Sequence, residues 1–322
     1  MAAKKNVLIG PYAVMVLFSF NVLTPGGSSY ATAGTLTILD APGAVYTHPY
    51  GIDGDNIVGV YWYESGPSYG FLYNGSNWTT LSMPEGDPVP FGIDGSNIVG
   101  SYYDNSDNNH HGFLCDGSTW TTLDMHGINH SDMALVDISG SNIVGWYYGG
   151  TSDWTSYKYH SFLYDGATWT NLDMPGADAT YVSAISGNNI VGSYQSVDDP
   201  FHAHGFIYDG LTWATIDAPG AENTNITGTD GDNIVGYYNA SIPGNYGNHG
   251  FLYNITSLTW ITFEIPGGGA SSGLWNISGN NAVGYYFDGS DYKEHGFIYA
   301  IPEPATISLL ALGGLMLRRR RM

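Results

Sequence analysis

The feature that most constrains this chain is a short string, Asn-Ile-Val-Gly, that returns at nearly regular intervals. It begins at six positions, the last time as Asn-Ala-Val-Gly: Asn56, Asn97, Asn142, Asn189, Asn233 and Asn281. Successive copies lie 41, 45, 47, 44 and 48 residues apart. Self-similarity at such a period indicates a repeat architecture, in which each copy is one supersecondary unit that packs against its neighbours.

Each repeat carries two further anchors. One is Gly-Phe-Leu-Tyr or a close variant, and the other is a Trp followed by two residues, a hydrophobic residue and usually Asp. With the segment before each repeat Asn, they give four short runs rich in Ile, Val, Tyr, Phe, Trp and Thr, which predict four β-strands. The intervening turns carry Gly, as at Gly54 and Gly187, and Gly tolerates the positive φ of tight hairpins.

Repeated four-stranded units of about 45 residues are typical of a β-propeller. We therefore predict an all-β fold, a six-bladed β-propeller of four-stranded blades over residues 34–300. The Tyr five residues after each repeat Asn is expected to pack between blades. Cys115 is the single cysteine, so we expect no internal disulfide and a buried core thiol.

The sixth repeat ends after Ala300 without its Trp-bearing fourth strand. The missing strand is expected at the other end of the chain, because residues 35–44 (TLTILDAPGA) match residues 212–221 (TWATIDAPGA). This N-terminal strand would complete the last blade and join the two ends of the ring, which leaves no open sheet edge at the seam.

Residues 1–33 predict a secretory signal peptide. They contain Lys4 and Lys5, an apolar stretch over residues 7–23, and an Ala-Thr-Ala site, with cleavage expected after Ala33. A retained membrane anchor is the alternative, but the apolar run is short for a span and Gly10-Pro11 interrupts it.

Residues 301–322 predict a hydrophobic tail helix with a basic end. Its apolar segment, residues 305–317, would rise only ~20 Å as a helix against a bilayer core of ~30 Å. We therefore expect transient membrane contact, with the basic end held on the cytoplasmic side. The motif residues on either side of this segment are Pro302, Glu303 and Pro304 before it and Arg318, Arg319, Arg320 and Arg321 after it.

The charge of residues 34–301 limits the partners of the predicted propeller. Lys158 and Lys293 stand against 28 acidic residues, which gives a formal charge near -26, and there is no Arg. Nucleic acid and anionic lipid require Lys and Arg to neutralise phosphate, so both are poor partners. Divalent cations would relieve the repulsion, and we regard calcium as a possible cofactor.

The tail, with its Pro-Glu-Pro motif, apolar segment and Arg run in order, resembles the PEP-CTERM sorting signal of exported proteins. Those proteins occur in Gram-negative bacteria that make extracellular polysaccharide. The resemblance implies partners in the export machinery and an exosortase that processes the tail at the inner membrane. It also implies a final location at the cell surface or in the extracellular matrix of a biofilm.

The repeats are similar to the extracellular HAF repeat family over residues 35–299, with His-Gly-Phe-Leu-Tyr where that family has His-Ala-Phe-Leu-Tyr. This resemblance implies an exported propeller-like domain and no assigned activity. The first repeat departs from the pattern because Tyr69 stands in place of the His.

The motifs of known enzyme mechanisms are missing from the sequence. It has no Cys-x-x-Cys or His-Glu-x-x-His string and no phosphate-binding glycine loop, and the repeats show no helical period that could form the strand-to-helix turn of a Gly-x-Ser-x-Gly nucleophile elbow. We therefore predict a non-enzymatic binding or structural module associated with exopolysaccharide. The alternative is a polysaccharide-active hydrolase or lyase that uses paired carboxylates such as Asp198 and Asp199, or Asp153.

In a four-stranded blade, the loops between strands two and three and the inter-blade connections share one face, and all ten His are expected there. Five occupy one repeated position and are expected to be structural hydrogen-bonding residues: His111, His160, His204, His249 and His295. Non-repeated histidines and nearby aspartates give a candidate metal site, although solvated loop residues are the alternative: His110, His126, His130, Asp104 and Asp107.

Aromatic residues of the same variable segments are candidates for stacking on sugar rings. The alternative is that they only cover the surface of the propeller. The candidate ligand-binding residues are Trp62, Tyr69, Trp154, Tyr157 and Phe201.

Overall fold

The computed structural model describes residues 21–23, 34–125, 130–149, 158–239, 248–263 and 268–301. Every regular element within these ranges is a β-strand, so the described part of the chain is all-β. Helices that could span a membrane are likewise not found in these ranges. Most of the expected signal peptide and nearly all of the expected tail lie outside the described residues.

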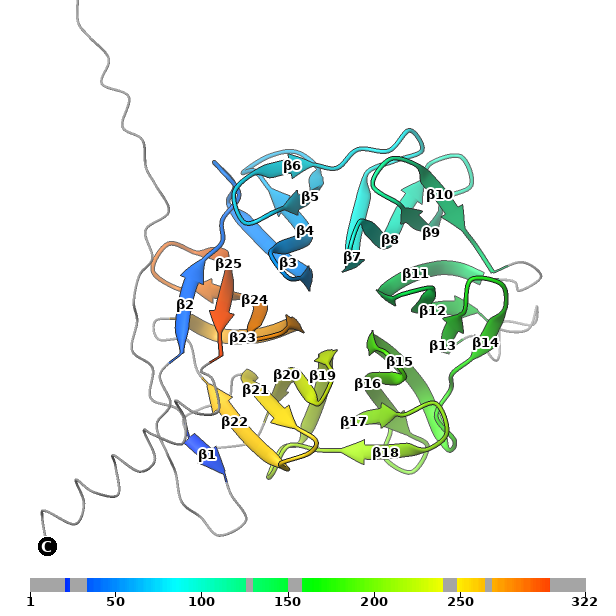
Figure 1. The fold of residues 1–322 in the computed structure, drawn as a ribbon, viewed down its shortest axis with the longest axis vertical. Coiled ribbons are helices and arrows are strands. Elements are labelled where there is room, and N and C mark those ends of the chain that lie inside the picture. The colour runs from blue at the N-terminus through cyan, green and yellow to red at the C-terminus, as the bar shows by residue number, and fades with distance from the viewer. Residues whose placement is uncertain are drawn as a thin grey trace, which may run out of the picture.

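The strands form antiparallel sheets of four that are arranged as blades around one axis (Figure 1). The first three blades are β3 (Tyr46–Asp53), β4 (Asn56–Trp62), β5 (Ser68–Tyr73) and β6 (Trp78–Thr80); β7 (Pro88–Asp94), β8 (Asn97–Asp104), β9 (Asn109–Cys115) and β10 (Trp120–Leu123); and β11 (His130–Ser139), β12 (Asn142–Gly149), β13 (Lys158–Tyr164) and β14 (Trp169–Asn171).

The next two blades repeat this order, and the last one takes its fourth strand from the N-terminal side. They are β15 (Ala177–Ser186), β16 (Asn189–Ser196), β17 (Ala203–Tyr208) and β18 (Trp213–Ile216); β19 (Asn223–Asp230), β20 (Asn233–Asn239), β21 (Asn248–Asn254) and β22 (Thr259–Phe263); and β23 (Gly268–Ser278), β24 (Asn281–Asp288), β25 (Lys293–Ala300) and β2 (Thr35–Ile38). A further short strand, β1 (Asn21–Leu23), pairs with the edge of β22.

The predicted closure of the ring is confirmed. Strand β2 pairs antiparallel with β25, with Thr35 opposite Ala300 and Ile38 opposite Phe297. The side chain of Leu36 is buried in a core cluster with Phe297 and Tyr299. The last blade thus contains both ends of the repeat region, and its outer edge is covered.

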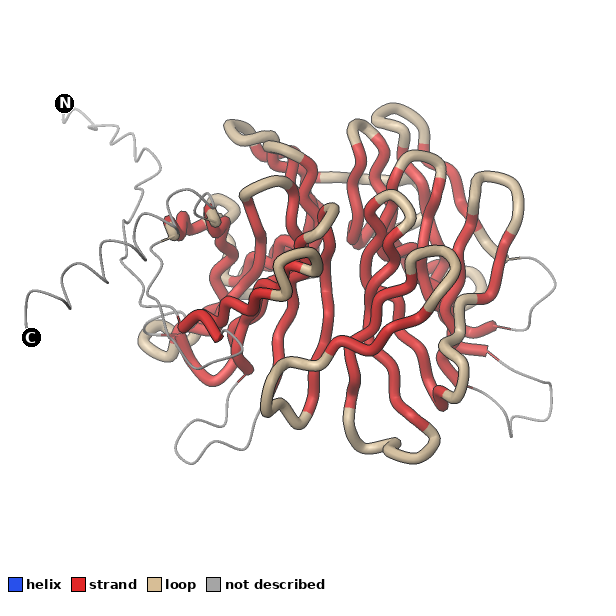
Figure 2. The backbone as a smooth tube through the Cα atoms, turned by 60° about the horizontal axis from the view of Figure 1, so that its bottom comes forward, coloured by secondary structure: helices blue, strands red, loops and turns tan. Residues whose placement is uncertain are grey.

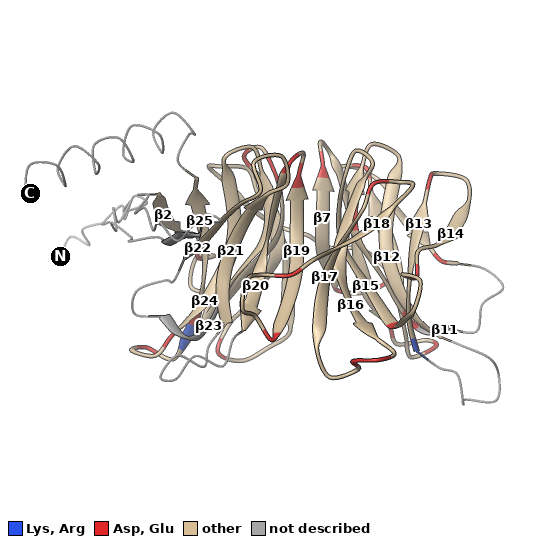
Figure 3. Ribbon diagram, turned by 90° about the horizontal axis from the view of Figure 1, so that it is seen from below, with Lys and Arg blue, Asp and Glu red and all other residues tan. Residues whose placement is uncertain are grey.

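Two faces of the disc differ in what they carry (Figures 2 and 3). We call the end with the hairpins between strands one and two and between strands three and four the turn face. The other end is the loop face, which carries the loops between strands two and three and the inter-blade connections. Lys158 begins β13 and Lys293 begins β25, so both lysines lie at the loop face, as predicted.

A ring of hydrogen bonds joins the blades at the turn face. In every blade the residue that ends the first strand accepts a hydrogen bond from the backbone N–H of the turn glycine in the next blade, at 2.5–3.1 Å. Ser278 of the last blade accepts from Gly54 of the first, so the ring is closed. Because the last residue of each first strand accepts a hydrogen bond from the next blade through its side chain, it is Asp or Ser in all six blades.

The core repeats one packing unit in each blade. A fully buried Phe from the third strand lies against the Gly of the Asn-Ile-Val-Gly string, as Phe113 does on Gly100. Cys115 is buried as well, which confirms its predicted place in the core. Tyr102 belongs to a core cluster that includes Val58 of the preceding blade, which agrees with the expected packing between blades, and its hydroxyl hydrogen-bonds Thr122 of its own blade at 2.9 Å.

Candidate functional site

Four of the repeated histidines form a clamp with an aspartate that stands one or two residues after the end of the neighbouring fourth strand. The Nδ1 atoms lie 2.6–2.9 Å from carboxylate oxygens, in the pairs His111–Asp124, His160–Asp173, His204–Asp217 and His295–Asp40. The prediction of a structural hydrogen-bonding role is confirmed for these four. The sequence signal for the partner was present, because it is the Asp that follows the repeated Trp.

The first blade changes both members of the clamp together. Tyr69 replaces the His, and Ser82 stands where the other blades have the Asp. Tyr69 packs on Tyr61, with ring centroids 5.4 Å apart, as His111 packs on Tyr102 at 5.5 Å, so the first blade keeps the ring contact without an ion pair. In the fifth blade the counterpart of the Asp is Glu264, which lies outside the described residues.

The clamps predict a specific dependence of stability on pH. Burial lowers the pKa of His111, but hydrogen bonds and charge attraction from Asp124 and Asp107 outweigh it, so the pKa is raised. A raised folded-state pKa stabilises the protein below the unfolded value of about 6.5, and this contribution is lost as pH rises through the folded value. His111→Gln should therefore lower the free energy of unfolding by about 0.5–1 kcal/mol at pH 6, and by less at pH 8.

Chemical denaturation at both pH values measures this difference. His110→Gln is the matched control, because the neighbouring His110 packs on Tyr103 with ring centroids 5.2 Å apart. An equal loss of stability for His111→Gln at both pH values would contradict the charged clamp.

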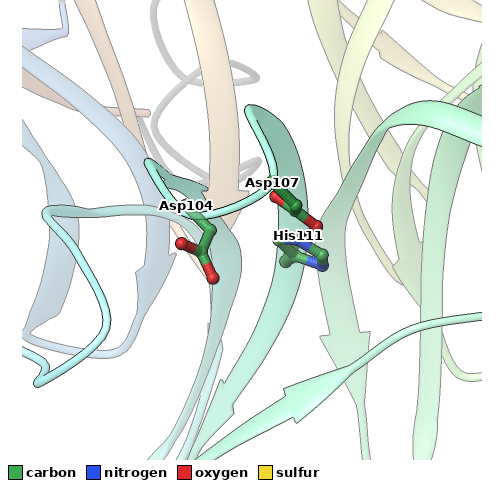
Figure 4. Close-up of side chains that lie close together, drawn as sticks. All are labelled: Asp104, Asp107 and His111. Carbon is green, nitrogen blue, oxygen red and sulfur yellow. Dashed lines mark hydrogen bonds and ion pairs between the residues drawn. The ribbon is translucent and has the colours of Figure 1, made fainter.

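The candidate metal ligands are brought together only in part. Asp104 and Asp107 lie with His111, and their ligand atoms all fall within 4.8 Å of one another (Figure 4). His110 is not a member of this cluster, because adjacent residues on a strand point to opposite faces. His126 lies outside the described residues, and the same is true of the side chain of His130.

A second cluster of the same pattern occurs in the last blade, formed by Asp288, Asp291 and His295. In both clusters the two ring nitrogens of the His already contact carboxylates. In His111 the distances are 2.7 Å to Asp124 and 3.0 Å to Asp107. A protonated imidazole thus holds the position that a cation would take, and a metal ion would have to displace its proton.

The three candidate sugar-stacking residues that the structure describes lie in two different blades. Trp62 and Tyr69 belong to the first blade and are half-buried, whereas Phe201 lies in the fourth blade with 86% of its surface exposed. Trp154 and Tyr157 lie outside the described residues, and so does Asp153. In the proposed carboxylate pair of Asp198 and Asp199, the Asp199 carboxylate accepts a hydrogen bond from His202 at 2.8 Å.

A pocket on the axis of the propeller is the site that the sequence analysis missed. We call it the channel pocket. It has a volume of about 300 Å³ and is lined by the first strands and their neighbours: Tyr50, Phe91, Val136, Trp146, Tyr181, Val182, Ser183, Thr227, Trp275 and Asn276. Half of these residues are aromatic, so the wall is apolar with a few polar groups, as in many ligand sites.

A part-buried pair of titratable groups adjoins the channel pocket at Tyr50, and we call this place the rim of the pocket. The His48 Nε2 atom lies 2.7 Å from the Glu294 carboxylate, with 12% and 33% of the side chains exposed. The other ring nitrogen, Nδ1, lies 3.4 Å from the hydroxyl of Tyr50, which lines the pocket. His48, Glu294 and Tyr50 thus form one connected polar chain that reaches the pocket wall.

Aromatic rings hold the His48–Glu294 pair in place. The imidazole of His48 stacks on Tyr285 with centroids 3.9 Å apart and contacts the edge of Trp62 at 4.8 Å. Trp275 stacks on Tyr285 in turn, at 5.6 Å. The imidazole cannot rotate without losing these contacts, so its orientation toward Tyr50 is fixed.

The protonation of this chain follows from its surroundings. Burial lowers the pKa of His48, although the Glu294 carboxylate opposes the shift, and the imidazole is neutral at neutral pH. Burial, with charge repulsion from Glu294, raises the pKa of Tyr285 to about 12. Burial likewise raises the pKa of Tyr50, so its hydroxyl keeps its proton.

The sequence does contain a signal for the channel pocket. The position that precedes the last three residues of each first strand differs in every repeat, although the residue two places later is Ile in five of the six: Tyr50, Phe91, Val136, Ser183, Thr227 and Trp275. A varying position beside a repeated one is typical of a surface that is not used for packing between repeats.

No known protein family and no curated protein matches the sequence. Among solved structures, a fungal lectin from Aleuria aurantia, described as a six-bladed β-propeller with a fucose recognition mode, has a TM-score of 0.49 at 17% identity and covers 78% of this chain and 89% of its own. The SapL1 lectin, solved with α-methyl fucoside, has a TM-score of 0.47 at 16% identity, with coverage of 81% and 98%.

The β-propeller domain of the Trilobed protease from Pyrococcus furiosus has a TM-score of 0.43 at 9% identity and covers 81% of this chain and 97% of its own. Similarities of this size assign neither a ligand nor an activity to this chain. The propeller fold is established by its own strand pairing.

Proposed function

We propose that this chain is an exported, non-enzymatic binding module that binds polysaccharide at the cell surface or in the extracellular matrix, with the channel pocket as its site. The observation that carries the proposal is the aromatic wall of that pocket, to which Tyr50, Phe91 and Trp275 contribute from three blades. Flat rings offer apolar planes to the C–H faces of a sugar, and hydroxyl groups at the rim orient it.

Export is the part of the proposal that rests on sequence. The predicted signal peptide and the PEP-CTERM-like tail support passage through the inner membrane and processing by an exosortase. The acidic, Arg-free propeller suits a salty exterior better than contact with nucleic acid. Cell fractionation with and without the run from Arg318 to Arg321 tests this location, because retention of both forms in the cytoplasm would contradict export.

The binding proposal predicts a saturable signal on an array of glycans, measured with the purified protein. Trp275→Ala and Phe91→Ala each remove a ring from the pocket wall, and each should weaken binding at least about tenfold, which is about 1.4 kcal/mol. Leu211→Ala is the control, since Leu211 lies on the turn face with 89% of its surface exposed. Failure to bind any glycan, or equal binding by all variants, would contradict the proposal.

Calcium enters the proposal only at the two Asp-Asp-His clusters. The same array measured with calcium and with a chelator tests this part. Binding that calcium strengthens, and that Asp104→Asn makes insensitive to calcium, would support a bridging cation at the loop face. Binding that is the same in both conditions would leave the cation without a role.

A polysaccharide-active hydrolase or lyase is the second candidate function, favoured by one observation. The His48–Glu294 pair at 2.7 Å is a part-buried acid–base pair next to Tyr50 of the pocket wall, and such pairs serve in proton transfer. Product release from a bound polysaccharide, lost in His48→Gln, would favour the enzyme. Saturable binding without product favours the binding module.

A further inference from the structure

We infer that the ligand of the channel pocket carries a positively charged amino group, so the polysaccharide is a polymer of amino sugars with free amines. The inference rests on the proposed function and narrows the class of its ligand. Three independent features of the described residues lead to it: the charge around the channel, the rings of its wall and the direction of its hydrogen bonds.

The charge around the channel favours a cation. The two lysines of the described chain, Lys158 and Lys293, stand at the first residues of β13 and β25 and do not line the pocket. Glu294 is connected to the pocket wall through His48, which contacts Tyr50, and a third of its side chain is exposed. Its charge is not matched by an Arg or Lys contact among the described residues. An acidic polysaccharide would place like charges beside this carboxylate.

The aromatic rings of the pocket wall also favour a positively charged ligand. Tyr50 lies 5.4 Å from Phe91 and 5.6 Å from Trp275, measured between ring centroids. The three rings form adjoining walls of one corner of the pocket. The negative face of an aromatic ring attracts an ammonium group, and the attraction is larger where water is excluded.

The hydrogen-bonding groups at the rim also favour a ligand that donates a hydrogen bond. Because the Glu294 carboxylate only accepts, Nε2 of His48 carries the proton and Nδ1 is left as an acceptor. The Tyr50 hydroxyl therefore directs its proton to Nδ1, over a long contact of 3.4 Å. The oxygen of Tyr50 is left to accept from the ligand, and an ammonium group offers only donors.

A sugar fits these features better than a lysine side chain does. A lysine offers the charge but no flat apolar face for the rings of Phe91 and Trp275. An amino sugar offers a charged nitrogen directly on a ring that can lie against an aromatic plane. Free lysine derivatives are consequently expected to compete weakly.

The test compares two oligosaccharides that differ only in charge. A β-linked glucosamine hexamer and its fully N-acetylated counterpart are titrated into the purified protein at about pH 6, with tryptophan fluorescence as the readout. We expect the free amine to bind at least tenfold more tightly. Nα-acetyl-lysine amide is the competitor that separates a sugar from a peptide ligand.

Two variants connect the preference to the proposed groups. Glu294→Gln keeps the shape of the side chain and removes its charge. The ratio of the affinities for the free-amine and the acetylated hexamer should therefore fall toward one, while the acetylated hexamer binds as before. Tyr50→Phe removes the accepting oxygen and should weaken binding of the amine by about tenfold. Tyr208→Phe is the matched control, because the Tyr208 hydroxyl donates to the Gly210 carbonyl at the turn face.

The outcomes separate the inference from the proposed function. Equal binding of both hexamers would overturn the charge inference and leave the binding module intact. A preference that survives Glu294→Gln and Tyr50→Phe would overturn the assignment to the channel pocket. Displacement of the hexamer by the lysine derivative at equal concentration would overturn the assignment of the ligand as a sugar. Absence of binding to every glycan on the array would overturn the proposed function as well.

Discussion

Deleting residues 35–40 should abolish the stable ring. The deletion removes β2 from the edge of β25, takes two buried side chains, Leu36 and Leu39, from the core, and breaks the clamp between His295 and Asp40. Truncating a single buried Leu costs about 2–5 kcal/mol, so the whole deletion should cost about 5 kcal/mol or more. The uncovered edge of β25 should also pair with other molecules and cause aggregation.

Thermal unfolding and size-exclusion chromatography measure both effects. Leu36→Ala is a smaller version of the same change, with an expected loss of about 2–4 kcal/mol. Asp40→Asn breaks only the clamp and serves as the control for the buried part. A deleted protein that melts at the temperature of the intact protein and stays monomeric would show that β2 does not hold the ring closed.

Gly100→Ala should strongly destabilise the protein although it adds only one methyl group. A Cβ atom built on Gly100 would lie 2.1 Å from the carbonyl oxygen of Val89 and 2.7 Å from the ring of Phe113. The Val89 carbonyl belongs to the backbone and lies next to a bulge between Pro90 and Gly92. It therefore cannot move aside as a side chain can. We expect a loss of about 3 kcal/mol or more in the free energy of unfolding.

The same close approach is found in every blade, at 2.0–2.2 Å from a carbonyl oxygen of the first strand: Gly59, Gly100, Gly145, Gly192, Gly236 and Gly284. Gly289→Ala is the matched control, because a Cβ there has no atom within 4 Å. Urea denaturation of both variants checks the prediction. Comparable stability of Gly100→Ala and Gly289→Ala would show that the first strand is free to shift.

The sequence by itself determined the local structure, the number of blades and the closure. These follow from short-range chemistry, since turn glycines, apolar strands and the match between residues 35–44 and 212–221 are all visible in the printed order. The burial of Cys115 and the bonding role of the repeated His were predictable for the same reason, because Cys115 takes the place of the repeated strand Tyr and the His recurs at one position of the repeat.

The alternation of side chains along β9 decides which histidine lies with the two aspartates. His110 and His111 are adjacent, and side chains alternate between the two faces, so only one of them can meet Asp104 and Asp107. A shift of one residue in the assumed register reverses this choice. The candidate metal site was assigned from the sequence to the correct loop and the correct face, but with His110 in place of the adjacent His111.

The channel pocket was decided by the tertiary structure alone. Its rim pair, His48 and Glu294, is 246 residues apart and meets because one backbone bridge joins Glu294 of β25 to Tyr46 of β3. Its wall takes one residue from each of several first strands, and those residues come together only when the ring closes around its axis. Repetition predicts how each blade folds, whereas a site on the axis depends on how the blades are packed together.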